Sequence, residues 1–107
     1  MDFEYRRKKY PARITMGAHL IYREQTGEDF TKAATRGAVG GIEVATLMWA
    51  SVRAACRADG VEFTASFEEF CDHVTPDEVS EWYARAEEQR AAEAKKKIAA
   101  MKATAKK

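Results

Sequence analysis

Residues 58–82, ADGVEFTASFEEFCDHVTPDEVSEW, contain two helix starts that can be recognised from the chemistry of their side chains. Ser66 is followed three residues later by Glu69, and Thr75 is followed in the same way by Glu78. This spacing is typical of a capping box, in which the hydroxyl accepts from an early helical N–H and the carboxylate accepts from the N–H of the cap residue. The stretch therefore predicts two short helices in close succession.

The second helix start carries a further signal, because Pro76 occupies the first helical position, where a missing N–H costs nothing. We predict helices over residues 67–73 and 76–90. Bulky apolar side chains recur along this part of the chain at three- and four-residue steps, which is typical of helices that share a core. The predicted core consists of Trp49, Val52, Cys56, Phe63, Phe67, Phe70, Val79 and Trp82.

The longest apolar stripe predicts a central helix over residues 42–58. Ile42, Val44 and Leu47 widen this stripe, so we expect the helix to be covered on more than one side. The glycine-rich segment before it, residues 27–41, predicts a loop with one helical turn after Asp29.

Aromatic and aliphatic side chains alternate on both sides of the basic run Arg6–Lys9, which predicts a β-hairpin over residues 3–14 with a charged turn. Thr15 as an N-cap and Gly27 as a C-terminal stop predict a helix over residues 16–26. Its buried face is expected to consist of Met16, Leu20, Ile21 and Tyr22.

These segments predict a mainly α fold: a small helical domain of four or five helices with an N-terminal β-hairpin and an Ala/Lys-rich helical tail. A chain of 107 residues can form only one modest core, which we assign to residues 1–90. Residues 91–107 form a basic tail that is either helical or disordered, because little in it can be buried.

The net charge of +1 conceals a strong asymmetry along the chain. Residues 1–13 carry a net charge of +3 and residues 94–107 carry +6, whereas the residues between them carry −8. An acidic body with basic ends favours association with copies of itself or with an acidic partner. We therefore predict a homo-oligomer.

Several classes of protein are not expected. No apolar run approaches 18 residues, and the first ten residues lack the apolar region of a signal peptide. Cys56 and Cys71 lack the spacing of a metal or redox motif and are expected to be buried, reduced thiols. His19 and His73 lack well-placed co-ligands, so neither a metal site nor a cofactor is predicted. Because no side-chain pattern suggests a nucleophile with its base, we predict that the protein is not an enzyme.

One alternative comes from the basic segments. Tyr5 and Tyr10 flank the basic turn and could stack on bases, while the lysine tail could bind phosphates. This pattern is compatible with a small nucleic-acid-binding accessory protein. The acidic body argues against it, since no predicted helix combines a basic face with base-reading side chains.

The order of elements resembles the small tail assembly chaperones of long-tailed bacteriophages, most closely those of phages and prophages of Bacteroides-type hosts. The resemblance covers residues 3–83. It rests on the opening FEYRRKKYPARITMGAHLIYREQTG, on an apolar helix ending RAACRADGVEF and on SFEEFCDHVTPDEVSEWY.

The resemblance implies a non-catalytic protein that binds the long, helical tape measure protein. It would keep that protein in solution while the major tail protein, a second possible partner, polymerises around it. The family acts in the host cytoplasm, is absent from the mature virion and often has a second, frameshifted product. We predict partner binding through Tyr5, Tyr10, Met16, Leu20 and Tyr22. Electrostatic attraction is assigned to Arg6, Arg7, Lys8, Lys9, Lys95, Lys96 and Lys97.

Overall fold

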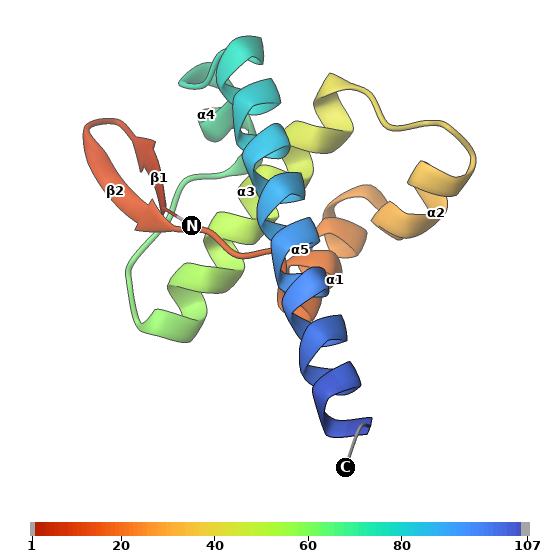
Figure 1. The fold of residues 1–107 in the computed structure, drawn as a ribbon. Coiled ribbons are helices and arrows are strands. Elements are labelled where there is room, and N and C mark those ends of the chain that lie inside the picture. The colour runs from red at the N-terminus through yellow and green to blue at the C-terminus, as the bar shows by residue number, and fades with distance from the viewer. Residues whose placement is uncertain (1, 106–107) are drawn as a thin grey trace.

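The computed structural model describes the backbone of residues 2–105 and the side chains of residues 2–98. Over this range it is mainly helical with a small antiparallel sheet, which confirms the predicted fold class. Helices α1, α4 and α5 and strand β2 pack against α3, which lies at the centre (Figure 1). The elements are β1 (Asp2–Tyr5), β2 (Lys8–Pro11), α1 (Met16–Thr26), α2 (Phe30–Thr35), α3 (Gly41–Asp59), α4 (Phe67–Asp72) and α5 (Pro76–Ala105).

The central helix α3 is buried along most of its length, as its wide apolar stripe predicts. The N–H of Gly40 donates to Glu43 Oε1 at 3.2 Å at its start. At its end, Gly60 takes a positive φ of 71° and its N–H donates to the carbonyl of Cys56. Ile42, in the first turn, is an exception: it is 67% exposed, because it lines an open groove on the surface.

The N-caps predicted at Ser66 and Thr75 are both present, but of the two bonds expected for the capping box at Ser66 only the one to its hydroxyl is found. The N–H of Glu69 donates to Ser66 Oγ at 3.2 Å, and this contact starts α4. At the start of α5 both halves of the capping box form: Thr75 N–H donates to Glu78 Oε1 at 3.1 Å, and Glu78 N–H donates to Thr75 Oγ1 at 3.2 Å. These local bonds fix where the two helices begin and how sharply the chain turns between them.

Helix α5 is longer than the predicted helix over residues 76–90 and continues to Ala105. No glycine or proline follows Arg90, and alanine and lysine both favour helix. The sequence after Arg90 therefore contains no residue that would break the helix. Val79, Trp82 and Ala86 are buried, whereas residues 88–98 are all exposed. The last turns of α5 therefore project from the body of the molecule (Figure 1).

Helix α1 has the predicted bounds, and two of the four residues of its predicted buried face, Ile21 and Tyr22, are buried. It approaches α3 through small residues: a Cβ placed on Gly17 would lie 3.5 Å from Ala54 Cβ and 3.2 Å from the guanidinium of Arg57. This close contact rotates Met16 and Leu20 outward, and both are exposed. The buried residues of α1 are Ala18, Ile21 and Tyr22.

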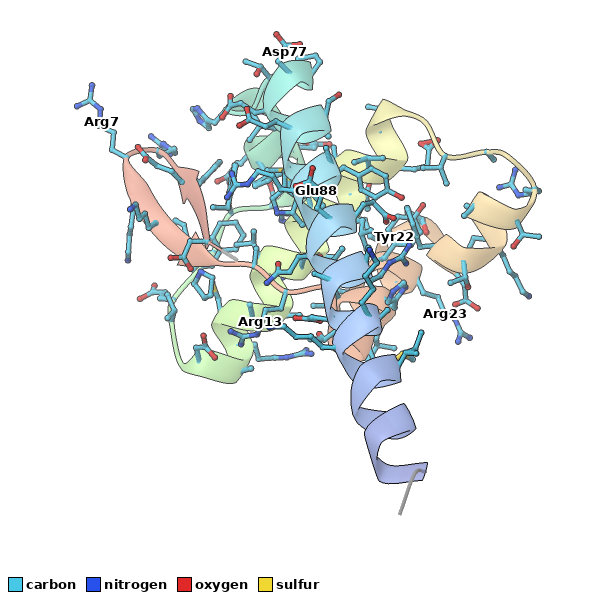
Figure 2. All side chains as sticks on the ribbon, viewed as in Figure 1. Arg7, Arg13, Tyr22, Arg23, Asp77 and Glu88 are labelled. Carbon is cyan, nitrogen blue, oxygen red and sulfur yellow. The ribbon has the colours of Figure 1, made fainter. Side chains whose placement is uncertain are left out.

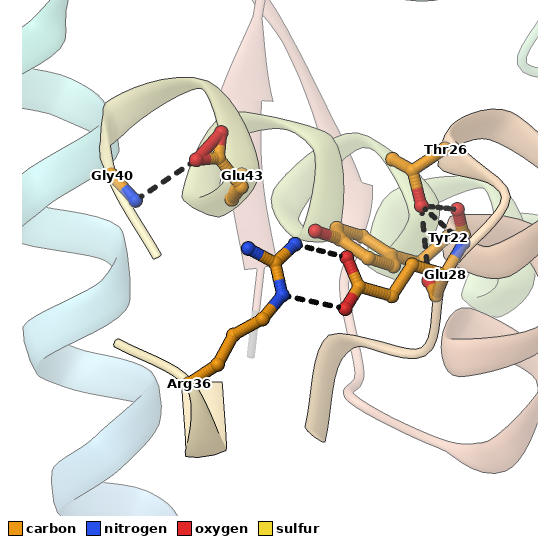
Figure 3. A network of polar contacts seen from close by, with 6 residues as sticks. All are labelled: Tyr22, Thr26, Glu28, Arg36, Gly40 and Glu43. Atoms are coloured by element: carbon orange, nitrogen blue, oxygen red, sulfur yellow. Dashed lines mark hydrogen bonds and ion pairs between the residues drawn. The ribbon is translucent and has the colours of Figure 1, made fainter. Parts of the chain in front are cut away.

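The segment between α1 and α3 contains the helical turn expected after Asp29, which extends into α2. Glu28 and Arg36 flank α2 and form a two-pronged ion pair, with Arg36 Nε donating to Glu28 Oε1 at 2.9 Å (Figure 3). The Arg36 guanidinium also lowers the pKa of the Glu28 carboxyl. Phe30 anchors α2 by packing edge-on against Tyr22, with the ring centroids 5.3 Å apart.

The hairpin pairs Phe3 with Tyr10 and Tyr5 with Lys8, so its turn has two central residues, Arg6 and Arg7. Both have positive φ, 50° and 70°, as a type I′ turn requires. Arginine reaches this region only with strain, whereas asparagine and glycine adopt it readily.

We expect the double substitution Arg6→Asn, Arg7→Gly to raise the free energy of unfolding by about 1 kcal/mol, because it relieves the strain of two positive φ angles. Urea unfolding followed by circular dichroism would measure this gain. The control Arg7→Lys keeps a side chain at the strained position and should leave stability unchanged. An Asn-Gly variant no more stable than the native chain would contradict the prediction.

Candidate functional site

Two of the five predicted partner-binding residues are wrong as surface residues, because they lie in the core. Tyr5 is 5% exposed and stacks on Phe70 with the ring centroids 5.3 Å apart. Its hydroxyl donates to the carbonyl of Glu69 at 3.2 Å, and burial raises the pKa of the phenol. Tyr22 packs beside Phe30 and is equally buried. Both hold the fold together and offer no contact area to a partner.

The other three predicted residues are accessible to different degrees. Met16 is 82% exposed and Leu20 is 51% exposed, and the two side chains lie one turn apart on α1. We call this pair the α1 patch. Tyr10 is half-buried: it meets Phe63 edge-on at a centroid distance of 5.1 Å, and Lys8 Nζ lies 5.2 Å from the centre of its ring.

The α1 patch begins next to a groove between α5 and the segment that precedes α1. Thr15, the N-cap of α1, lines a surface groove of about 260 Å3 together with Arg90 and Glu93 of α5. Met16 directly follows Thr15, so the patch starts beside the point where α5 leaves the body. Polar Arg23 and Glu24 on the next turn of α1 are exposed.

The predicted electrostatic residues are exposed, but they do not form one surface. Arg6, Arg7, Lys8 and Lys9 lie at the tip of the hairpin, where Figure 2 labels Arg7. Lys95, Lys96 and Lys97 lie on the projecting part of α5. The hairpin tip lies at the upper left of the molecule and the C-terminal end of α5 at the bottom (Figures 1 and 2).

A further surface feature was not predicted from the sequence. An apolar groove of about 410 Å3 lies where the start of α3 meets the α4–α5 junction. Exposed Ile42 forms one of its walls. The other lining residues are Gly41, Ala45, Cys71, Val74, Thr75, Pro76, Val79 and Ser80. The sequence signal that could have revealed it is Val74, a bulky apolar residue between two helices that each begin with their own cap.

The two cysteines differ in their surroundings, and both are free. Cys56 is buried as predicted, whereas Cys71 is only partly buried, because it lines the apolar groove. Burial raises the pKa of both thiols, which favours the protonated, less reactive form. Among the described residues, no three histidine, cysteine or carboxylate side chains are grouped as metal ligands would be.

Comparison with known proteins gives no match: no family model, no curated protein and no solved structure aligns with this chain. Within residues 2–105, no helix is both long enough and apolar enough to cross a lipid bilayer.

Proposed function

We propose that this protein is a non-catalytic assembly chaperone that binds and solubilises a phage tape measure protein in the host cytoplasm during tail assembly. The observation that supports this most directly is the α1 patch. Met16 and Leu20 are large apolar side chains, they lie outside the core, and they are spaced as two anchors on one helix face. A helix with apolar residues at three- and four-residue steps would pack against such a face.

The chemistry of the patch suits a client with many similar segments. Methionine is flexible and polarizable, so it adapts to side chains of different shape. Full burial of one such side chain contributes about 1.5–3 kcal/mol. After the cost of association, two anchors give weak and reversible binding at any one segment. Reversibility is required of a chaperone that must be displaced when the tail forms.

Co-expression with the tape measure protein tests the proposal. We expect that protein to be recovered in the soluble fraction with the native chain, and to be lost from it with the double variant Met16→Glu, Leu20→Glu. Burying two carboxylates at the contact would weaken binding to an apolar helix face of the tape measure protein. Both positions are exposed, so the variant should fold normally, which circular dichroism can verify.

The control is Ile42→Glu, which places one such negative charge at an exposed isoleucine outside the α1 patch. It should leave client recovery unchanged. If the tape measure protein is equally soluble with and without this chain, the chaperone proposal is wrong. Binding to single-stranded nucleic acid that falls steeply with salt would instead favour the nucleic-acid alternative.

A further inference from the structure

We propose that the basic end of α5 in one copy of this chain docks in the apolar groove of a second copy, with Ile98 as its apolar anchor. The two surfaces lie at opposite ends of the same molecule. The contact is distinct from the α1 patch and does not depend on the client proposed above.

The groove has an apolar lining, and two exposed carboxylates lie next to lining residues in the chain. Its lining contains Ile42, Val74 and Val79, and its volume lies within the range of small-ligand sites, so an aliphatic side chain can enter. Asp72 and Glu81 directly follow lining residues and are exposed. From residue 61 to residue 84 the chain carries seven carboxylates and no lysine or arginine. This segment supplies most of the groove's lining, so its net negative charge favours a cationic occupant.

The projecting part of α5 is complementary to this groove in both respects. Lys95, Lys96 and Lys97 are exposed and directly precede Ile98, which is 54% exposed. From residue 94 onward the sequence contains six lysines and no acid. An isoleucine that follows three lysines is complementary to an apolar groove with carboxylates nearby in the chain. One contact would bury the Ile98 side chain and pair the opposite charges.

The same copy cannot provide both surfaces. Val79 lies at the groove and Ile98 lies nineteen residues later on one continuous helix. At 1.5 Å per residue the two side chains are about 28 Å apart along the axis. The contact must therefore join two molecules, and each molecule keeps one free groove and one free helix end. Such a head-to-tail contact links copies in series, into an open chain or, where the rotation closes, into a ring.

The interface is small, so the association should be weak and sensitive to salt. Exposed charge pairs are screened over about 10 Å at 0.1 M ionic strength. In sedimentation equilibrium, the average mass of the native chain should rise with protein concentration at low salt and fall towards the monomer at high salt.

A pair of charge-reversed variants gives the decisive test. The arm variant carries Lys95→Glu, Lys96→Glu and Lys97→Glu; the groove variant carries Asp72→Lys and Glu81→Lys. In each variant alone, the side chains next to Ile98 and those at positions 72 and 81 carry like charges, so its self-association should be weaker than that of the native chain. An equimolar mixture should associate again, because each arm then meets a groove of opposite charge. Circular dichroism of each variant confirms that it is folded.

The apolar anchor is tested separately. Ile98→Ser should weaken self-association by about tenfold, since much of one aliphatic side chain is no longer buried. Met16→Ser is the matched control at an exposed apolar residue outside the contact, and it should change nothing. The variant Met16→Glu, Leu20→Glu should likewise associate normally while losing its client, so the two proposals can fail independently.

Three outcomes would overturn the inference. The native chain could remain monomeric at low salt at every concentration. Both charge-reversed variants could associate as strongly as the native chain, which would indicate another surface, such as the edge of the hairpin. The mixture of the two variants could also remain monomeric.

Discussion

Replacing Phe70 with alanine is expected to lower the free energy of unfolding by roughly 3–5 kcal/mol. Phe70 is fully buried, and its ring lies 5.7 Å from Phe3, 5.3 Å from Tyr5 and 6.4 Å from Phe63, centroid to centroid. The truncation would leave a cavity at the point where the hairpin, α4 and the loop before α4 meet. Small domains have about 5–15 kcal/mol of total stability, so at the lower end of this range the loss would unfold a large fraction of the molecules.

Urea unfolding followed by circular dichroism measures this effect. Phe70→Leu keeps most of the buried volume and should cost only about 1–2 kcal/mol, which remains measurable if the alanine variant does not fold. Ile42→Ala removes an exposed side chain and should change stability by less than about 0.5 kcal/mol. If the alanine variants at Phe70 and Ile42 were equally stable, Phe70 would not be a core residue.

Trp49→Ala is expected to have a comparable effect, again roughly 3–5 kcal/mol. The indole of Trp49 is buried between α3 and the loop before α4, and it meets Phe67 edge-on with centroids 5.7 Å apart. Its Nε1–H donates to the carbonyl of Ala65 at 3.0 Å. The guanidinium carbon of Arg53 lies 5.0 Å from the indole centre. Alanine would remove all three contacts.

The variant Trp49→Phe separates the hydrogen bond from the packing. It keeps an aromatic ring but leaves the carbonyl of Ala65 without its donor, which should cost about 1–3 kcal/mol. Arg53→Ala removes only the contact on the indole face and should cost less than about 1 kcal/mol. Unfolding should be followed by circular dichroism, because fluorescence changes when Trp49 is replaced. If Trp49→Ala costs no more than Arg53→Ala, the indole is not central to the core.

The elements that could be predicted from the sequence are those fixed by local chemistry. The caps at Ser66 and Thr75 depend on partners three residues away, so their spacing alone locates the starts of α4 and α5. Gly27 and Gly60 end α1 and α3 with positive φ for the same reason. The apolar stripe of α3 correctly predicts that most of this helix is buried, because neighbouring elements cover it on several sides.

The buried face of α1 could be predicted only at Ile21 and Tyr22, because hydrophobic periodicity gives weight to bulky residues and ignores small ones. Gly17 and Ala18 allow α1 to approach α3 closely, and this contact decides which side faces inward. Met16 and Leu20 were expected to be buried for their size alone. Their exposure leaves them available as a surface and weakens no part of the core.

Tyr5 and the apolar groove illustrate a second limit, which is distance along the chain. Tyr5 is buried by Phe63 and Phe70, which lie roughly sixty residues later in the chain. The charged residues next to Tyr5 in the sequence therefore led to the wrong prediction that it is a surface residue. The groove likewise combines the first turn of α3 with residues 71–80. A surface assembled from separate segments appears only when the tertiary contacts are known.

Helix α5 belongs to the core at one end and to the surface at the other, without a break between them. The buried turns around Val79 and Trp82 fix the direction of the whole rod, so its exposed end has a set orientation relative to the body. A flexible tether would hold a partner at many angles. A partner bound by the exposed end of α5 is instead held in one orientation. Repetition of that orientation between identical copies generates a screw axis of fixed pitch and handedness.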